Sequence, residues 1–350
     1  MSFTHLHVHS NYSFCRGAAT IDNLCRKAGE LNYTHLALTD TNGLSGAVEF
    51  QDHCSLAGIH AIFGMECWLS DFGLDRRVPD QQSPTYAQST RSSPSFDRLV
   101  LLAENEQGWA NLCWLSSKLH SEPGGNVTPV TLADLASHHQ GLVCLAGGVR
   151  SLLAYQMRVN AENTAHQSLT ELQQIYPKSL YINLQIHQPS DVRLCSNLAR
   201  LARRKNLPLV ASHEIHYLND KDEELQQLMT AIRLNQPIRE VDPSETAAAH
   251  ASFLTPAEMD QRFQAYPQAL RNSVRIAERC QFRLPLGKTH FPIPALPSGE
   301  SADSLLRKKA LAGAIERYGQ ITAEIQLRLD HELSIIAQCG FAALFLIVEN

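Results

Sequence analysis

Long hydrophobic runs are missing from this sequence. The longest clean run, FAALFLIV at 341–348, is too short to cross a bilayer. The first residues, MSFTHLHVHS, also lack the charged region followed by an apolar segment that marks a secretory signal peptide. We therefore expect a cytoplasmic protein with no membrane partner.

Paired cysteines and a strong charge imbalance are missing as well. The nine cysteines include no CxxC pair, which argues against a zinc ribbon, and an odd, unpatterned set fits reduced thiols better than a disulfide framework. The formal net charge of -5 excludes a polybasic DNA-coating protein. A hydrophobic content of 44% excludes a disordered chain.

Short apolar runs alternate with helical patterns, which predicts an α/β fold. The expected strands are 3–9, 35–40, 61–69, 98–103, 141–146, 180–186 and 208–213, and the expected helices between them are 21–31, 45–57, 106–119, 161–175 and 190–205. Seven strands with helices between them suggest a closed, parallel βα barrel, and a doubly wound open sheet is the alternative. Polar residues at the carboxyl ends of several strands favour the barrel, because barrel active sites are built there.

The chain divides near residue 285. Residues 70–96, rich in Ser, Pro, Gln and Arg, are expected to form a long loop, and helical patterns replace strands after about 217. We expect a barrel domain over 1–285, with its strands within 3–213 and a helical extension over 218–285. Residues 286–350 then hold the Pro-rich linker PIPALPSGES and further helices. The chain ends inside an apolar helical pattern, so it looks cut from something longer.

Histidine is abundant, with 16 residues, and the first expected strand carries three of them. With a period of two, His5, His7 and His9 share one face of a strand. An HxH pair at a strand end is a moderately specific sign of metal binding. The alternative is a polar strand edge with solvated histidines.

Other chemically capable residues follow the ends of later strands. Asp40 is a metal ligand or the cap of the next turn, and Glu66 lies in an apolar run where a carboxylate needs a partner. His187 follows the sixth expected strand, and Glu214 and His216 follow the seventh. Placement at five strand ends predicts a present or ancestral metal site in the barrel mouth.

Several ordered motifs carry a family resemblance. FTHLHVHSNYSF, LALTDTNGLSGAVEF, GMEC, LVLLAENEQGWANLC and PLVASHEIHYL resemble the polymerase-and-histidinol-phosphatase (PHP) domain, a seven-stranded βα barrel. These motifs are similar to the version of the PHP domain at the N-terminus of bacterial C-family DNA polymerases, the DNA polymerase III alpha subunits. FCRGAA, TDTNGL, LMTAIRLNQPI and RIAERCQF are most similar to the error-prone branch. The resemblance runs from residue 3 to about 346.

The resemblance implies a set of metal ligands that this sequence keeps only in part. The matching positions are His7, His9, Glu66, Glu214, which replaces an Asp, and His216. Four positions depart from the ligand pattern: Arg16, Thr41, Arg98 and Gly148. Asp40 and His187 are weaker candidates. Two ligand positions have become cations, which repel a divalent ion.

The resemblance therefore implies a degenerate site with at most one divalent ion, zinc or manganese, and a structural or interaction role. A PHP phosphoesterase uses a metal-activated hydroxide and needs most of the ligands. The full-length family protein is a DNA-directed DNA polymerase, a nucleotidyltransferase that requires Mg²⁺, with DNA and replication or repair proteins as partners. The sequence has no Asp-x-Asp-x-Asp motif, so no catalytic residue for polymerisation is expected in this chain, and residues after 285 resemble the start of the polymerase region.

Two alternatives remain open. One is an active metal-dependent phosphoesterase or 3′–5′ exonuclease. The other is a free-standing PHP-like partner of a split polymerase.

Overall fold

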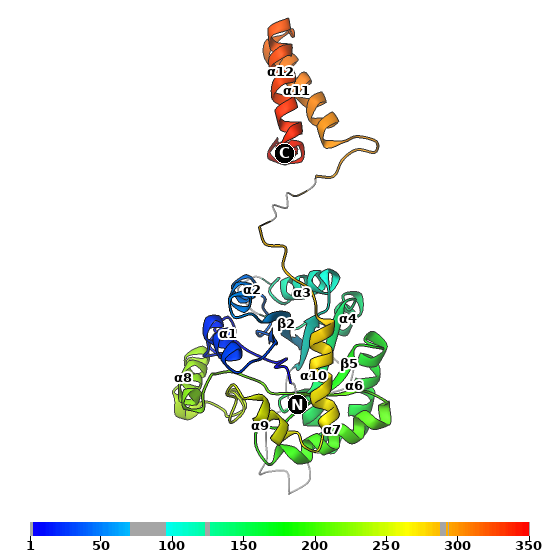
Figure 1. The fold of residues 1–350 in the computed structure, drawn as a ribbon. Coiled ribbons are helices and arrows are strands. Elements are labelled where there is room, and N and C mark those ends of the chain that lie inside the picture. Colours follow the sequence, from blue (N-terminus) through cyan, green and yellow to red (C-terminus); the bar gives the residue numbers. More distant parts are fainter. Residues whose placement is uncertain (1–2, 71–95, 123–126, 288–291, 293, 350) are drawn as a thin grey trace. The chain divides into compact units, whose positions relative to one another are not determined.

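The computed structural model describes residues 3–70, 96–122, 127–287, 292 and 294–349. Its contacts divide the chain into two compact units, Met1–Leu284 and Pro285–Asn350 (Figure 1). The loop expected over 70–96 lies, apart from its two end residues, outside the described residues.

The first unit is built on a six-stranded sheet in which each strand pairs with the next strand of the chain. The strands are β1 (His35–Leu38), β2 (His60–Leu69), β3 (Asp97–Ala103), β4 (Leu142–Gly147), β5 (Leu180–Gln185) and β6 (Leu209–Ser212). The predicted α/β fold is confirmed. The expectation of a parallel sheet is wrong at β3, which runs antiparallel to both β2 and β4. A buried apolar run fits a strand of either direction, so the sequence pattern of β3 does not determine which way it runs.

The expected strand at 3–9 is extended chain with a single bridge, between Val8 and Ile215. Its backbone bonds to β1 on one side, through Ala37 N–H to the His5 carbonyl (3.0 Å). On the other side it exchanges bonds with Ile215, just after β6. The Val8 N–H donates to the Thr39 hydroxyl (2.8 Å) instead of to a backbone carbonyl, which interrupts the ladder. The segment thus links the two outer strands and gives the sheet a barrel-like closure.

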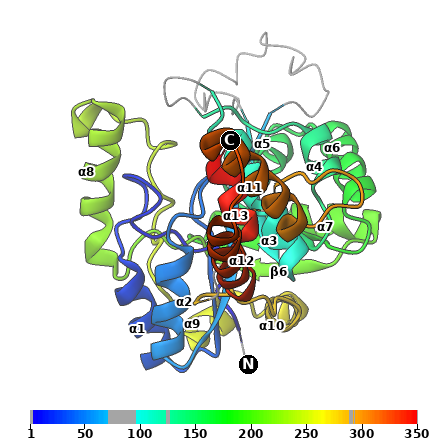
Figure 2. The same cartoon turned by 90° about the horizontal axis from the view of Figure 1, so that it is seen from above.

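The helices of the first unit surround this sheet (Figure 2). Those predicted between strands are α1 (Ile21–Glu30), α2 (Ala47–Leu56), α3 (Glu106–Leu119), α6 (Glu162–Ile175) and α7 (Asp191–Lys205). Two short helices, α4 (Leu132–Ser137) and α5 (Leu152–Arg158), were not expected. The helical extension holds α8 (Glu223–Leu234), α9 (Pro256–Arg262) and α10 (Pro267–Arg279) with the short 3-10 turns Asp220–Asp222 and Ile238–Glu240.

A small apolar cluster fills the inside of the sheet. It contains Leu6 of the extended first segment and, from the strands, Ala37, Ile62, Val100, Leu102, Val143, Leu145 and Val210. Ile276 and Ala277 of α10, which packs against β6, and Cys280, just after α10, also belong to it. Because side chains alternate along a strand, Ile62 and Glu66 lie on the same face of β2. The apolar layer therefore lies below the polar residues at the strand ends and keeps them together at one mouth.

The second unit contains α11 (Ala302–Tyr318), α12 (Ala323–Gln338) and α13 (Ala342–Glu349). Within the described residues no single helix is long and apolar enough to cross a membrane. Taken together, α12 and α13 are long and apolar enough by length and composition, but the chain bends by 111° between them.

Candidate metal centre

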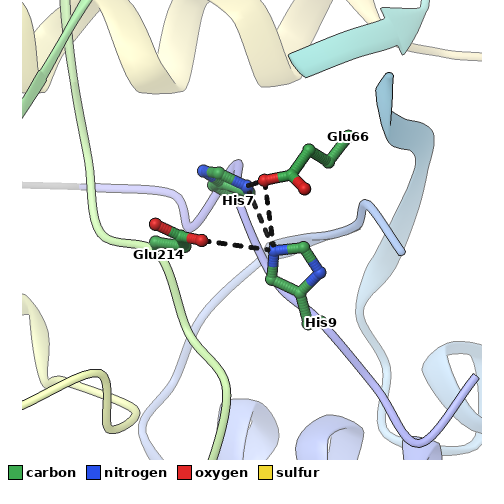
Figure 3. Close-up of side chains that lie close together, drawn as sticks. All are labelled: His7, His9, Glu66 and Glu214. Carbon is green, nitrogen blue, oxygen red and sulfur yellow. Dashed lines mark hydrogen bonds and ion pairs between the residues drawn. The ribbon is translucent and has the colours of Figure 1, made fainter. Parts of the chain in front are cut away.

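Four buried side chains meet at the mouth of the barrel-like sheet: His7, His9, Glu66 and Glu214 (Figure 3). One nitrogen or carboxylate oxygen from each lies within 4.8 Å of all the others. The histidines come from the extended first segment, Glu66 from β2, and Glu214 from the chain that follows β6. Residues far apart in sequence are therefore brought together by the curl of the sheet.

The donor atoms face a common point. His7 Nε2 is 3.2 Å from His9 Nε2 and 3.4 Å from Glu66 Oε2. His9 Nε2 is 3.9 Å from Glu66 Oε2 and 3.8 Å from Glu214 Oε1. Two imidazoles and two carboxylates are a donor set that zinc and manganese accept, so by chemistry these residues fit one divalent ion.

The charge states of three of the four residues suit cation binding. Burial lowers the pKa of His9 well below its ordinary value, and the neighbouring His216 lowers it further, so His9 is neutral at pH 7. Burial raises the pKa of Glu66, but the Arg98 guanidinium and the hydrogen bond from His7 outweigh it and hold that pKa well below the usual range. The pKa of Glu214 is lowered in the same way against burial, chiefly by His216. Both glutamates are therefore ionised.

His216 lies beside the cluster and is not one of its four members. Its ring stacks on that of His9, with centroids 4.3 Å apart and planes 9° apart. Its Nε2 is 2.9 Å from Glu214 Oε1, and its Nδ1 is 3.1 Å from the carbonyl oxygen of Arg16. These two contacts hold the His216 ring in place beside the cluster.

Asp40 lies outside the cluster and organises the loop that follows the first segment. It accepts from the Ser10 N–H (2.7 Å), the Ser10 hydroxyl (2.8 Å) and the Ser13 hydroxyl (2.5 Å). The two roles expected for Asp40 were a metal ligand and the cap of the turn that follows it, and these bonds to the preceding 10–13 loop match neither. Ser13 also contacts His9 Nδ1 (3.1 Å), so Asp40 orients His9 indirectly.

His187 and His5 are also separate from the cluster. The His187 ring stacks on His213 with centroids 4.3 Å apart, and among the described residues neither of its nitrogens has a hydrogen-bond partner. Burial lowers the pKa of His187 to about 4. The expectation that His5, His7 and His9 share one face is wrong, because the backbone there is not a regular strand. His5 Nε2 instead contacts the Leu254 carbonyl (2.9 Å).

Arg16 and Arg98 lie near Glu66, each over an aromatic ring. Arg16 lies over the Trp68 ring at 5.0 Å, Trp68 stacks on Phe96 at 4.0 Å, and Arg98 lies over Phe96 at 5.8 Å. Cations on aromatic faces are held electrostatically by the ring quadrupole. Burial lowers the pKa of Arg16 to about 9, with Arg233 and Arg98 adding to the effect. Arg16 nevertheless remains charged at pH 7.

Arg150 also reaches the site, although the sequence did not predict it. Its Nη1 is 3.9 Å from Glu214 Oε1, and burial lowers its pKa to about 10. A cavity of about 830 Å³ is lined by Arg98 and Arg150 among others. The only sequence signal was a lone arginine just after the fifth expected strand, which is not specific.

Thr41 and Gly148 stand at the two other positions where the resemblance implies ligands. The Thr41 hydroxyl lies 3.3 Å from His9 Nδ1 and 3.4 Å from Glu66 Oε1, so it bonds to the side chains that would ligate. Gly148 has φ of +87°, and a Cβ there would lie 2.6 Å from Gln185 Oε1. A side-chain ligand at 148 would need both a strained backbone and a displaced glutamine.

Comparisons with known proteins agree with this architecture. The family model described as "PHP domain" matches residues 5–187. The chain is 32% identical to a DNA polymerase III subunit alpha of Treponema pallidum, covering 99% of this chain and 29% of that protein. It is 31% identical to an error-prone DNA polymerase of Symbiobacterium thermophilum, with coverages of 99% and 31%. The chain thus spans about a third of the length of these relatives.

A solved structure has a weaker likeness. An amidohydrolase from Chromobacterium violaceum is 16% identical with a TM-score of 0.39, covering 61% of this chain and 88% of that one.

Proposed function

This chain belongs to the PHP domain family, and we propose that it is the N-terminal part of a bacterial DNA polymerase III alpha subunit of the error-prone type. This proposal is supported by the two named relatives, whose alignments each cover 99% of this chain. The full-length protein would act in DNA replication or damage-tolerant synthesis as a nucleotidyltransferase. Its partners would be DNA and replication or repair proteins, in the cytoplasm.

We propose residues 1–285 as the PHP domain and 286–350 as the linker and start of the polymerase region. The division of contacts at Leu284 and Pro285 supports this boundary. Polymerisation would depend on Mg²⁺ and on carboxylates outside these residues, since the sequence contains no Asp-x-Asp-x-Asp motif.

The PHP domain itself would hold at most one divalent ion and have a structural or interaction role. The observation that carries this proposal is the pairing of one four-residue donor cluster with arginines at two ligand positions, Arg16 and Arg98. His7, His9, Glu66 and Glu214 would hold the ion, which would neutralise the two carboxylates. Arg98 and Arg150 already supply positive charge to these glutamates, so the fold depends less on a metal.

The test compares this 350-residue chain with the full-length protein in a primer-extension assay with Mg²⁺. The full-length protein should extend the primer and the chain alone should not. Template-dependent incorporation by the purified chain would overturn the proposal. Elemental analysis of the metal-reconstituted chain should give no more than one ion.

A metal-dependent phosphoesterase or 3′–5′ exonuclease is the second candidate. The observation in its favour is the cavity lined by Arg98 and Arg150, because guanidinium groups bind phosphate and Arg150 also lies 3.9 Å from Glu214. Metal-dependent hydrolysis of a phosphomonoester or of a DNA 3′ end, lost in His9→Ala, would establish it. A free-standing partner of a split polymerase is the third, and the reading frame after Asn350 decides that question.

A further inference from the structure

Gln185, at the end of β5, is buried against His7, and its partners determine the orientation of its amide. Its Oε1 accepts from the Val149 N–H (3.0 Å), which can only donate. Its Nε2 therefore faces His7 Nδ1 (3.1 Å) and Ser212 Oγ (3.2 Å). The Ser212 hydroxyl donates its own hydrogen to Asn183 Oδ1 (2.7 Å), so its oxygen is free to accept from Gln185. Each group is satisfied in this one orientation.

The amide orientation determines where His7 carries its proton. Since Gln185 Nε2 donates, His7 Nδ1 accepts, and a neutral imidazole then has its single N–H on Nε2. That N–H faces His9 Nε2 at 3.2 Å and Glu66 Oε2 at 3.4 Å. His7 thus presents a hydrogen where a metal ligand presents a lone pair.

His9 has the opposite arrangement. Its Nδ1 is 3.1 Å from Ser13 Oγ, and the Ser13 hydroxyl donates to Asp40 Oδ1 at 2.5 Å. Ser13 therefore accepts from His9 Nδ1–H, and the Nε2 lone pair of His9 points into the cluster. Metal-ligating histidines nearly always donate their other N–H to an acceptor in this way. His9 has such an acceptor and His7 does not.

We propose that Gln185 is a positioning residue that holds His7 in the Nε2–H tautomer, so that the metal-free cluster closes on itself through hydrogen bonds. A divalent ion must displace that hydrogen before His7 binds it, which weakens metal binding. The tautomer of His7 does not depend on a bound metal. The effect on metal affinity rests on the proposed metal centre.

The test is Gln185→Glu, a change of nearly equal shape. A carboxylate at 185 still accepts from Val149 N–H, and it also accepts from His7 Nδ1–H, which leaves the Nε2 lone pair for a metal. In metal-free protein at pH 7, ¹⁵N NMR should show His7 protonated on Nε2 in the wild type and on Nδ1 in the variant. Zinc affinity measured by titration calorimetry should rise about 10- to 100-fold.

Asn183→Asp is the matched control. It adds the same charge to the same hydrogen-bond network, through Ser212, without a contact to His7. An equal gain in affinity from this control would overturn the proposal, as would Nδ1 protonation of His7 in the wild type. A changed tautomer with unchanged affinity would refute the metal centre and leave the role of Gln185 in place. Should Gln185→Glu fail to fold, Gln185→Met removes the donor and should produce a mixture of both tautomers, and a single Nε2–H tautomer in it would overturn the proposal.

Discussion

The His9 and His216 rings stack with their planes 9° apart, and only His9 belongs to the four-residue donor cluster. His216 instead donates to Glu214 Oε1 at 2.9 Å, so it supports one glutamate from outside the cluster. The two histidines are therefore not equivalent, although both match ligand positions in the sequence. Removing each should have a different effect on metal content.

We expect His9→Ala to abolish binding of the single divalent ion, because it removes a lone pair that faces both glutamates. His216→Ala should weaken binding and leave a stoichiometry of one. Elemental analysis after metal reconstitution measures both. His53→Ala on α2, remote from the cluster, is the control. Two or three tightly bound ions in the wild type, lost in His9→Ala together with phosphatase activity, would contradict the single-ion proposal.

The paired substitution Thr41→His and Arg98→His should allow a second ion to bind. It adds two imidazoles and removes the guanidinium that stabilises ionised Glu66. At about 4 Å and an effective dielectric of 20, repulsion between two unit charges is about 4 kcal/mol, so removing one cation is a large change for a weak site. Thr41→Val with Arg98→Leu is the control, since it removes the same groups without adding ligands. A stoichiometry that stays at one in the double histidine variant would count against the ligand correspondence.

Gly148→Ala should destabilise the protein by about 1–3 kcal/mol, which is the typical cost of a non-glycine residue in a sparsely populated backbone region. The new Cβ would lie 2.6 Å from Gln185 Oε1 at a φ of +87°. Gly58→Ala is the matched control. Gly58 also has positive φ (+69°), but nothing lies within 4 Å of the Cβ that an alanine would add there. Chemical denaturation gives the free energy of unfolding. Equal losses in the two variants would show that contact with Gln185 contributes nothing.

Much of the candidate site could be predicted from strand-end positions. His7, His9 and Glu214 lie next to the carboxyl ends of extended segments, and the curled sheet brings them to Glu66, which lies within β2 (His60–Leu69). Two roles were expected for Asp40, a metal ligand or the cap of the next turn, whereas its three hydrogen bonds go to Ser10 and Ser13 in an earlier loop.

The parts that could not be predicted depend on contacts between distant segments. The Val8 N–H bonds to the Thr39 hydroxyl, and His5 contacts the carbonyl of Leu254, far away in the sequence. Gln185 and Arg150 acquire their roles only through side chains from other strands, and neither residue type in its local sequence indicates a site. The antiparallel direction of β3 likewise does not follow from its apolar pattern, which fits a strand of either direction.

Acid should destabilise the fold between about pH 6.5 and pH 4 through buried neutral histidines. Burial lowers the pKa of His187 and of His5 to about 4, and that of His213 well below its ordinary value. In that window the unfolded chain binds protons that the folded chain does not, so the free energy of unfolding falls as pH falls. A shift from about 6.5 to about 4 corresponds to about 3 kcal/mol per group when fully expressed.

His187→Phe tests this directly. Both nitrogens of His187 lack partners among the described residues, and a phenyl ring can keep the stacking on His213, so stability at pH 7 should be retained or raised. Urea unfolding is measured at pH 7, 6 and 5, with EDTA present to exclude metal effects. The free energy of unfolding should fall less with falling pH in the variant than in the wild type. The slopes of this free energy against pH should differ by up to one proton per molecule. An identical slope in the two proteins would mean that His187 is already protonated in the folded state or accessible to solvent, contrary to its burial here.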